Sequence, residues 1–287
     1  MNKRLILAIM LGLLLMVLAA CGGTDDATDD GDDAEGTEDV EVEDDADADA
    51  DAGDDAVATD GEVYTVATDN GYVPFEYIDE ETGDLIGFDI DLITALAEEA
   101  GIEIEFETLE FDGIVAGISS GRFDIAIAGM TITEERQESI DFTQPYYEAG
   151  LILAVLDDNE EIQSIDDVDG KVVATRTGST SETYLNEETD ADIEAFPQII
   201  EGYQNVLSGR ADAVLYDLPN VLFYSEQEAD GRLKTVGEKL TGEDYGIAFP
   251  KGSELRDVID DALTNLKENG TYDDIYEEWF GDRPEGT

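Results

Sequence analysis

The sequence predicts an α/β fold for the chain from Glu62 onward. In this part, short segments of β-branched and aromatic residues alternate with stretches whose apolar residues recur at helical spacing. Such alternation is typical of α/β folds, in which helices cover the faces of a sheet. The 287 residues suffice for one large domain or for two lobes of ordinary size once the ends are set aside.

Five segments of this part are predicted to be strands. Each is short, mostly apolar and rich in β-branched or aromatic residues, as strands of a buried sheet are. The segments are 63–67, 102–106, 151–155, 171–175 and 211–216.

Two helices are marked by residues that favour helix ends. Asp89 or Asp91 is the expected N-cap of the first and Gly101 its C-terminal stop, so the two aspartates are interpreted as caps rather than as an acid/base couple. Ser253 is the expected N-cap of the second, and Gly270 its stop. The expected buried stripes are Ile93, Leu96, Ala97 and Ala100 in the first helix and Leu255, Val258, Ile259, Ala262, Leu263 and Leu266 in the second.

The N-terminus has the layout of a secretory signal. Lys3 and Arg4 precede an unbroken apolar run over 5–18, and small residues then lead to Cys21, as in the bacterial lipobox. Acylation of Cys21 after cleavage would anchor the chain to the membrane on its extracytoplasmic side; an uncleaved membrane anchor is the alternative. No other apolar run approaches the roughly 20 residues that span a bilayer. We therefore expect the mature protein to be attached to the membrane without crossing it.

Residues 22–61 are expected to be a disordered acidic tether. This segment consists mainly of Asp, Glu, Ala, Gly and Thr and has no aromatic residue, so it cannot bury a core. The alternation of acids with alanine over 44–55 leaves metal binding as an alternative, but a self-repelling, extended spacer is the preferred interpretation.

Composition excludes several classes of function. The formal net charge of −60 opposes nucleic-acid binding, because a basic surface would have to face the phosphates. One cysteine and no histidine leave no disulfide, Cys/His metal site or histidine-dependent catalytic triad, and no cofactor is expected. The negative charges of the chain also repel one another. At about 1 M salt, where the Debye length is roughly 3 Å, this repulsion is largely screened, which indicates a salt-loving host. An acidic surface that collects calcium is the alternative.

Six sequence blocks, in order between Glu62 and Pro284, carry a family resemblance: VPFE (73–76), GFDIDL (87–92), AGMTITEER (128–136), GRADAVLYD (209–217), YGIAFPKG (245–252) and NGTY (269–272). Together they resemble the amino-acid family of periplasmic-type solute-binding proteins, its glutamine-binding members most closely. The resemblance implies the type II two-lobed fold, with crossing strands near 146–150 and 241–245. Lobe 1 would comprise 62–147 and 245–287, and lobe 2 would comprise 148–244.

The resemblance also implies a function. Such a protein captures a polar amino acid outside the cell as a monomer, closes its lobes over it, and delivers it to the permease of an ABC transporter. One alternative on the same architecture is an enzyme of the cyclohexadienyl dehydratase type, but every carboxylate that matches the family already has a role in holding an amino acid. The other is a sensor domain, which would need a membrane segment and an output domain after Thr287. No catalytic residue is assigned.

Arg136 is the site residue for which the sequence itself argues most. Thr133 is a plausible N-cap, which places Arg136 in the first turn of a helix, where the helix dipole disfavours a cation. A planar guanidinium can bind an α-carboxylate through two parallel bonds, its role in the family. A surface ion pair with Glu134 or Glu138 is the alternative.

The other site residues are implied by the resemblance. Asp217 would accept the ligand ammonium, and the turn over 177–181 would hold the carboxylate from the opposite lobe. Helix capping is the alternative for both. The rings of Tyr72 and Phe111 would sandwich the aliphatic stem of the ligand. Asp69, as an acceptor, and Arg176, as a cation, would meet the end of the ligand side chain. The full set is Asp69, Tyr72, Phe111, Ala128, Gly129, Thr131, Arg136, Arg176, Ser179, Thr180 and Asp217.

Glutamine is the first choice of ligand, because Asp69 can accept its amide N–H and Arg176 can donate to its C=O. Three positions depart from the glutamine-binding pattern: Arg176 replaces a lysine, Tyr216 a histidine and Thr180 a glycine. Glutamate is the second choice, and cationic amino acids are disfavoured by Arg176.

Overall fold

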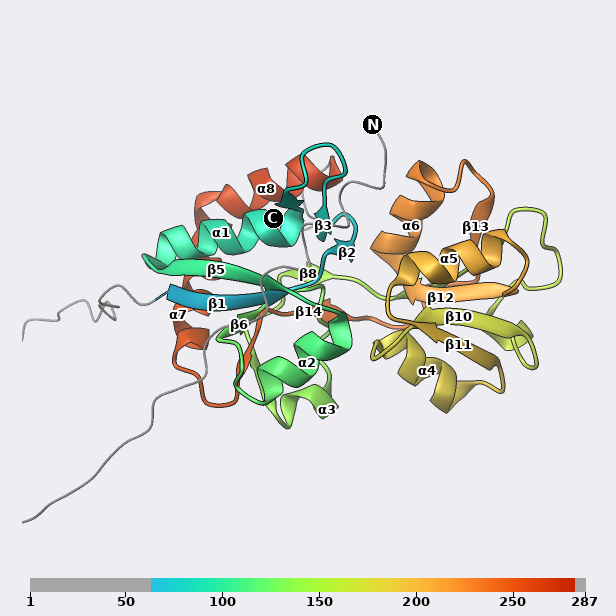
Figure 1. Ribbon diagram of the computed structural model, residues 1–287, viewed down its shortest axis with the longest axis horizontal. Coiled ribbons are helices and arrows are strands. Elements are labelled where there is room, and N and C mark those ends of the chain that lie inside the picture. Colours follow the sequence, from blue (N-terminus) through green and yellow to red (C-terminus); the bar gives the residue numbers. More distant parts are fainter. Residues whose placement is uncertain (1–62, 282–287) are drawn as a thin grey trace, which may run out of the picture. The chain divides into compact units, whose positions relative to one another are not determined.

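The computed structural model describes residues 63–281, which form two α/β lobes, each built on a five-stranded sheet (Figure 1). The predictions for residues 1–62 concern the signal sequence, the acylated Cys21 and the tether, and they lie outside the described residues. Within residues 63–281, no helix has the length and apolarity that a bilayer crossing requires.

The first lobe contains the sheet with strand order β5-β1-β6-β15-β7. Strand β1 runs parallel to β5 and β6, whereas β15 is antiparallel to β6 and β7. Its strands are β1 (Val63–Thr68), β5 (Glu103–Thr108), β6 (Ile125–Ala126), β7 (Ile140–Phe142) and β15 (Ala248–Pro250), with a smaller sheet of β2 (Gly71–Tyr72), β3 (Glu76–Ile78) and β4 (Leu85–Ile86) beside it.

Helices cover both faces of this sheet, and successive residues of β1 face different helices, as the strand period requires. Val66 packs in a cluster with Leu92 of α1 and Leu263 of α7, whereas Ala67 packs with Ile114 of α2. The helices of the lobe are α1 (Phe88–Ala100), α2 (Phe111–Ser119), α3 (Glu134–Gln137), α7 (Leu255–Asn269) and α8 (Thr271–Phe280).

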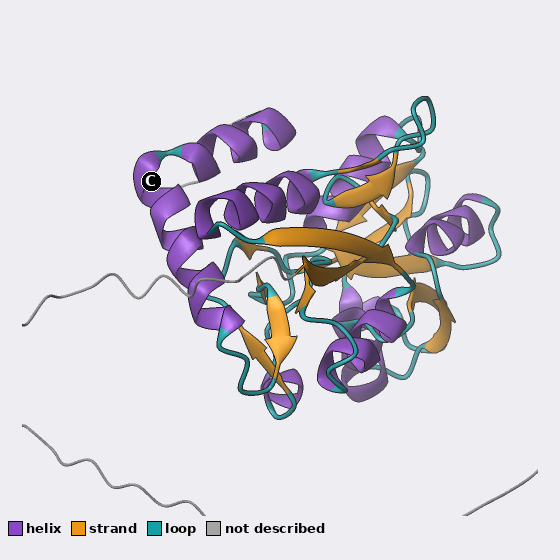
Figure 2. Ribbon diagram, turned by 60° about the vertical axis from the view of Figure 1, so that its left-hand side comes forward, coloured by secondary structure: helices purple, strands orange, loops and turns teal. Residues whose placement is uncertain are grey.

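The second lobe repeats this architecture with strand order β11-β10-β12-β9-β13. Its central strands are buried on both faces, which explains the continuous apolar run over 151–156. Figure 2 shows helices on both sides of the strands. The elements are β9 (Leu151–Leu156), β10 (Val172–Arg176), α4 (Thr180–Glu188), β11 (Asp192–Phe196), α5 (Ile199–Leu207), β12 (Ala213–Asp217), α6 (Leu218–Gln227) and β13 (Leu233–Val236), with a short 3₁₀ helix at Ile165–Asp167.

Two segments cross between the lobes, and they contain the short strands β8 (Tyr147–Glu148) and β14 (Asp244–Tyr245). These strands pair antiparallel, with Tyr245 opposite Tyr147. The two-lobed fold with two crossing strands is therefore confirmed. The predicted lobe boundaries fall inside these two strands.

All five predicted strands are present, and their ends differ from the prediction by at most two residues. Both glycine stops are confirmed, since Gly101 (φ 67°) and Gly270 (φ 86°) have the left-handed conformation. The sequence predicts these strands and helix ends because each depends on residues that are close together in the chain.

The predicted N-caps of both long helices are wrong. Helix α1 begins after Gly87 with no side-chain cap, because Asp89 is buried in the lobe and Asp91 accepts a hydrogen bond from Trp279 Nε1 (2.7 Å). Helix α7 has Glu254 at its N-cap position, one residue after Ser253, and again no side-chain cap.

Candidate ligand-binding site

Arg136 reaches from the first lobe to the second. The Thr133 side chain accepts a hydrogen bond from the Arg136 backbone N–H (3.1 Å), which confirms the predicted N-cap of α3. The guanidinium donates to the carbonyl of Thr131 (2.8 Å) in its own lobe and to the carbonyl of Gly178 (3.2 Å) in the other. Arg136 therefore spans the cleft.

The guanidinium of Arg136 still has donors for a carboxylate. Within the described residues, no ion pair includes Arg136, so the alternative pairing with Glu134 or Glu138 is not found. Two of its five N–H groups are engaged by the two carbonyls. Burial lowers the pKa of Arg136, and the attraction of nearby carboxylates opposes this shift. An anion bound here would favour the charged form.

Asp217 ends β12 with a buried carboxylate that is only half satisfied. Its Oδ2 accepts hydrogen bonds from the hydroxyls of Tyr72 (3.0 Å) and Tyr245 (2.5 Å). Its Oδ1 is buried and has no hydrogen-bond partner within residues 63–281. Although Asp217 occupies the N-cap position of α6, its side chain makes no capping hydrogen bond. This argues against the alternative interpretation of Asp217 as a helix cap. Burial raises its pKa, so a nearby cation would stabilise the carboxylate.

Arg136 and Asp217 line one small cavity between the lobes. Its volume is about 10 Å³, enough for about one water molecule, so an amino acid enters only if the lobes or the side chains move. Of its lining residues, only Tyr216 is absent from the predicted set. The lining consists of Phe111, Ala128, Gly129, Thr131 and Arg136 from the first lobe and Ser179, Thr180, Tyr216 and Asp217 from the second.

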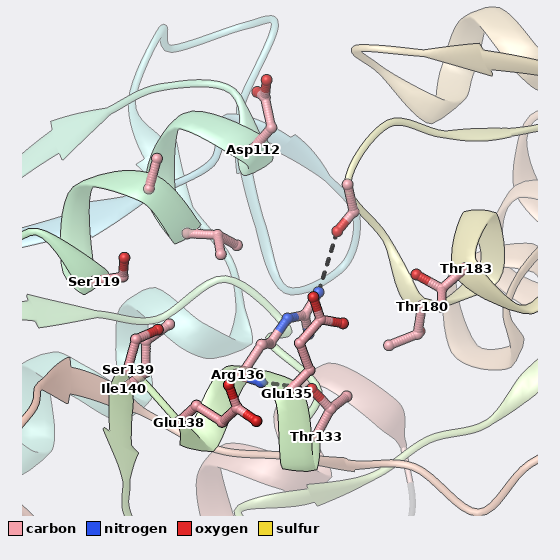
Figure 3. Close-up of a pocket in the computed structure, with 13 residues that line it drawn as sticks. Asp112, Ser119, Thr133, Glu135, Arg136, Glu138, Ser139, Ile140, Thr180 and Thr183 are labelled. Carbon is pink, nitrogen blue, oxygen red and sulfur yellow. Dashed lines mark hydrogen bonds between the residues drawn. The ribbon is translucent and has the colours of Figure 1, made fainter.

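A larger cavity of about 660 Å³ is also lined by Arg136. In Figure 3, Arg136 and Thr133 lie on one side of this cavity, and Thr180 and Thr183 lie on the other. Arg136 and Thr180 are the residues that line both cavities, one from each lobe.

Asp69 and Arg176, expected at the end of the ligand side chain, form a buried ion pair with each other. Arg176 is 1% exposed, and its Nε donates to the carbonyl of Pro197 (3.1 Å). Asp69 also accepts bonds from the backbone N–H groups of Asn70 (2.5 Å) and Gly71 (3.0 Å). The pair joins the end of β1 to the end of β10, and neither residue lines the small cavity.

The two rings expected to sandwich the ligand stem have different surroundings. Phe111 lines the small cavity, and the guanidinium carbons of Arg136 and Arg176 lie 5.2 and 5.3 Å from its ring centroid. Tyr72 stacks on Phe75, with 5.1 Å between ring centroids, and its hydroxyl contacts Asp217. Phe111 is therefore placed to contact a ligand, whereas Tyr72 supports the carboxylate.

The turn over 177–181 leads into α4, as expected for an anion site at a helix start. Ser179 is the N-cap residue, and its side chain accepts a bond from the Glu182 N–H (3.2 Å). The Gly178 N–H is donated to Glu182 Oε2 (2.7 Å), so this N–H is occupied. The backbone N–H groups in the first turn of α4, beginning at Thr180, are further donors on the second-lobe side, because the first N–H groups of a helix have no partner within the helix.

Glu243 contacts two residues that line the small cavity, and the sequence did not indicate it. It precedes β14, is 8% exposed, and accepts hydrogen bonds from the hydroxyls of Thr131 (3.3 Å) and Thr180 (3.1 Å). Burial, with repulsion from Asp217, raises its pKa to about 7. Among 74 acidic residues, nothing in its neighbourhood distinguished it.

A second pair of carboxyls supports the site from within the first lobe. Asp89 Oδ2 accepts hydrogen bonds from the Gly129 N–H (2.9 Å) and the Tyr146 hydroxyl (2.8 Å). Glu76 is buried, and within residues 63–281 neither of its carboxyl oxygens nor Asp89 Oδ1 has a hydrogen-bond partner. Burial, with repulsion from Asp89, raises the pKa of Glu76 well above its ordinary value, which favours its protonated form.

A two-lobed α/β fold whose lobes both contribute charged groups to one cavity is typical of solute-binding proteins of the periplasmic type. The family model of the bacterial extracellular solute-binding proteins, family 3, matches residues 64–282. The chain belongs to this family. The arginine-binding extracellular protein ArtP of Bacillus subtilis (strain 168) is 33% identical over 222 residues, which cover 75% of this chain and 85% of that protein.

Solved structures give the same result. An ancestral arginine-binding protein bound to arginine is 44% identical, with a TM-score of 0.73, covering 76% of this chain and 98% of that chain. The structure of an ancestral arginine-binding protein bound to glutamine is also 44% identical, with a TM-score of 0.71 and coverages of 77% and 98%. Solved relatives of this chain thus include one structure with bound arginine and one with bound glutamine.

Proposed function

We propose that this protein captures a polar amino acid outside the cell and delivers it, as a monomer, to the permease of an ABC transporter. The observation that carries the proposal is the pairing of opposite charges at one cavity. The Arg136 guanidinium has unused donors, and Asp217 Oδ1 is an unused acceptor. An α-carboxylate and an α-ammonium satisfy these two groups together.

Glutamine is the proposed ligand, and glutamate is the second choice. The Asp69–Arg176 pair offers an acceptor and a donor, which match the N–H and C=O of a carboxamide. The second positive charge of arginine or lysine would approach Arg176 in a poorly solvated site, at a high electrostatic cost. The relative solved with glutamine supports the assignment, although relatives named for arginine make arginine the main competitor.

Calorimetric titration of the full chain with glutamine, glutamate, asparagine and arginine, at constant molar salt, tests the ligand. We expect glutamine to bind most tightly. If arginine binds tenfold more tightly than glutamine, a difference of about 1.4 kcal/mol, the assignment of Asp69 and Arg176 as partners of a glutamine side chain is overturned. The proposal that the protein binds an amino acid would remain. Turnover of prephenate or arogenate by the same preparation would instead indicate the dehydratase-like enzyme.

We also propose that a lipid on Cys21 holds the protein at the membrane. Cys21→Ser should then release the processed chain into the soluble fraction, because the lipid would be the only anchor left after signal cleavage. Fractionation followed by immunodetection measures this. Retention of the processed variant in the membrane fraction would contradict the lipid anchor and favour another mode of attachment.

A further inference from the structure

Glu243 receives one hydroxyl group from each lobe. Its Oε2 accepts a hydrogen bond from Thr131 Oγ1 (3.3 Å), in the first lobe, and another from Thr180 Oγ1 (3.1 Å), at the start of α4 in the second. Both threonines line the small cavity. The carboxylate itself belongs to the segment that crosses between the lobes just before β14.

These contacts fix the polarity of both hydroxyls. An ionised carboxylate only accepts hydrogen bonds, and a hydroxyl has one hydrogen and two lone pairs. The hydrogens of Thr131 and Thr180 therefore point to Glu243. Toward the cavity, the two oxygens can offer lone pairs alone, so they can receive a donor but cannot bind a carboxylate.

We propose that Glu243 is a positioning residue that turns both threonine hydroxyls into acceptors for the α-ammonium of the ligand, beside Asp217. This inference rests on the proposed function, because it assumes an amino acid in the cavity. The acceptor groups would then form one side of the cavity, and the Arg136 guanidinium would be the donor for the carboxylate. An amino acid could bind in one orientation only.

The charges around Glu243 agree with this role. Asp217 on β12 and Arg136 on α3 are the charged groups that act on it, and its repulsion from Asp217 is relieved when a cation lies between them. With a pKa of about 7, Glu243 is mostly ionised at pH 8. The polarity of the threonines is therefore best tested at that pH.

The test compares two ligands that differ at one group. L-glutamine and its 2-hydroxy analogue, which has a hydroxyl in place of the ammonium, are titrated by calorimetry at pH 8 in molar salt. Glu243→Leu is close in size but offers no acceptor, so the hydrogens of Thr131 and Thr180 are free to turn toward the cavity. We expect the preference for glutamine over the analogue to fall by about tenfold or more in this variant, because the two hydroxyls are no longer held as acceptors.

Two further variants complete the experiment. Asp244→Asn removes the exposed neighbouring charge and should leave the preference unchanged. Thr131→Val removes one acceptor while keeping the shape of the side chain, and it should also lower the preference, which covers the case that Glu243→Leu does not fold. An unchanged preference in both Glu243→Leu and Thr131→Val, with glutamine still bound, would contradict only the role of Glu243. Failure of the wild-type chain to bind glutamine would overturn this inference together with the ligand proposed for the site.

Discussion

Replacing Arg136 by alanine is expected to weaken amino-acid binding by about 3 to 5 kcal/mol, the usual cost of leaving a buried charge without its partner. The ligand carboxylate would lose the donors that Arg136 offers beside the cavity, while Asp217 would still hold the ammonium. The variant also loses the contact with Gly178 that joins the two lobes. Calorimetry in molar salt with glutamine measures the effect.

Arg122→Ala is the matched control. Arg122 is an exposed arginine of the same lobe, it pairs with the exposed Glu107, and its guanidinium lies over the ring of Phe123 at 4.6 Å. Exposed ion pairs contribute about 0 to 1 kcal/mol, and Arg122 does not line either cavity of the cleft. Equal losses of affinity in the two variants would show that Arg136 acts only as a surface cation.

Local signals explain why much of the fold and Arg136 could be predicted. Thr133 caps α3 through a contact three residues away, and Gly101 and Gly270 end their helices through their own backbone conformation. The period of the apolar residues identified the buried face of α7, because that face is fixed by the helix geometry itself.

Contacts between distant residues explain what was missed. Asp89 has the residue type and position of a helix cap, yet its carboxylate bonds the N–H of Gly129, 40 positions later, and the hydroxyl of Tyr146, 57 positions later. The partners of Glu243 are equally remote, since Thr131 lies 112 positions before it. No pattern in the neighbouring sequence carries such information, so only the packed lobes disclose these roles.

The Asp69–Arg176 pair illustrates the same limit at the ligand itself. The family resemblance named both residues, which are 107 positions apart, as partners of the ligand side chain, and the structure shows that they also partner each other. A glutamine side chain reaching them would have to replace part of this ion pair with its own amide group. The Asp69–Arg176 pair is thus electrically neutral before any ligand arrives, which would suit an uncharged side chain.

This arrangement makes Arg176 the residue with the largest expected effect on selectivity. Its guanidinium pairs with Asp69, so a bound arginine would have to displace it in order to use the same carboxylate. Arg176→Ala removes this group and leaves the buried Asp69 carboxylate without its cation. A free arginine can then supply the missing charge, so we expect its affinity to rise by at least about tenfold, 1.4 kcal/mol, while glutamine loses the donor to its C=O.

Lys171→Ala is the control for this variant, because Lys171 directly precedes the same strand but pairs with the exposed Glu161 (2.8 Å) at the surface. Its removal should leave both affinities unchanged. The measurement is a pair of calorimetric titrations, with arginine and with glutamine, on each protein at constant molar salt. If Arg176→Ala gains nothing for arginine and keeps its affinity for glutamine, Asp69 and Arg176 do not meet the ligand. The Asp69–Arg176 pair would then serve only to join the lobes.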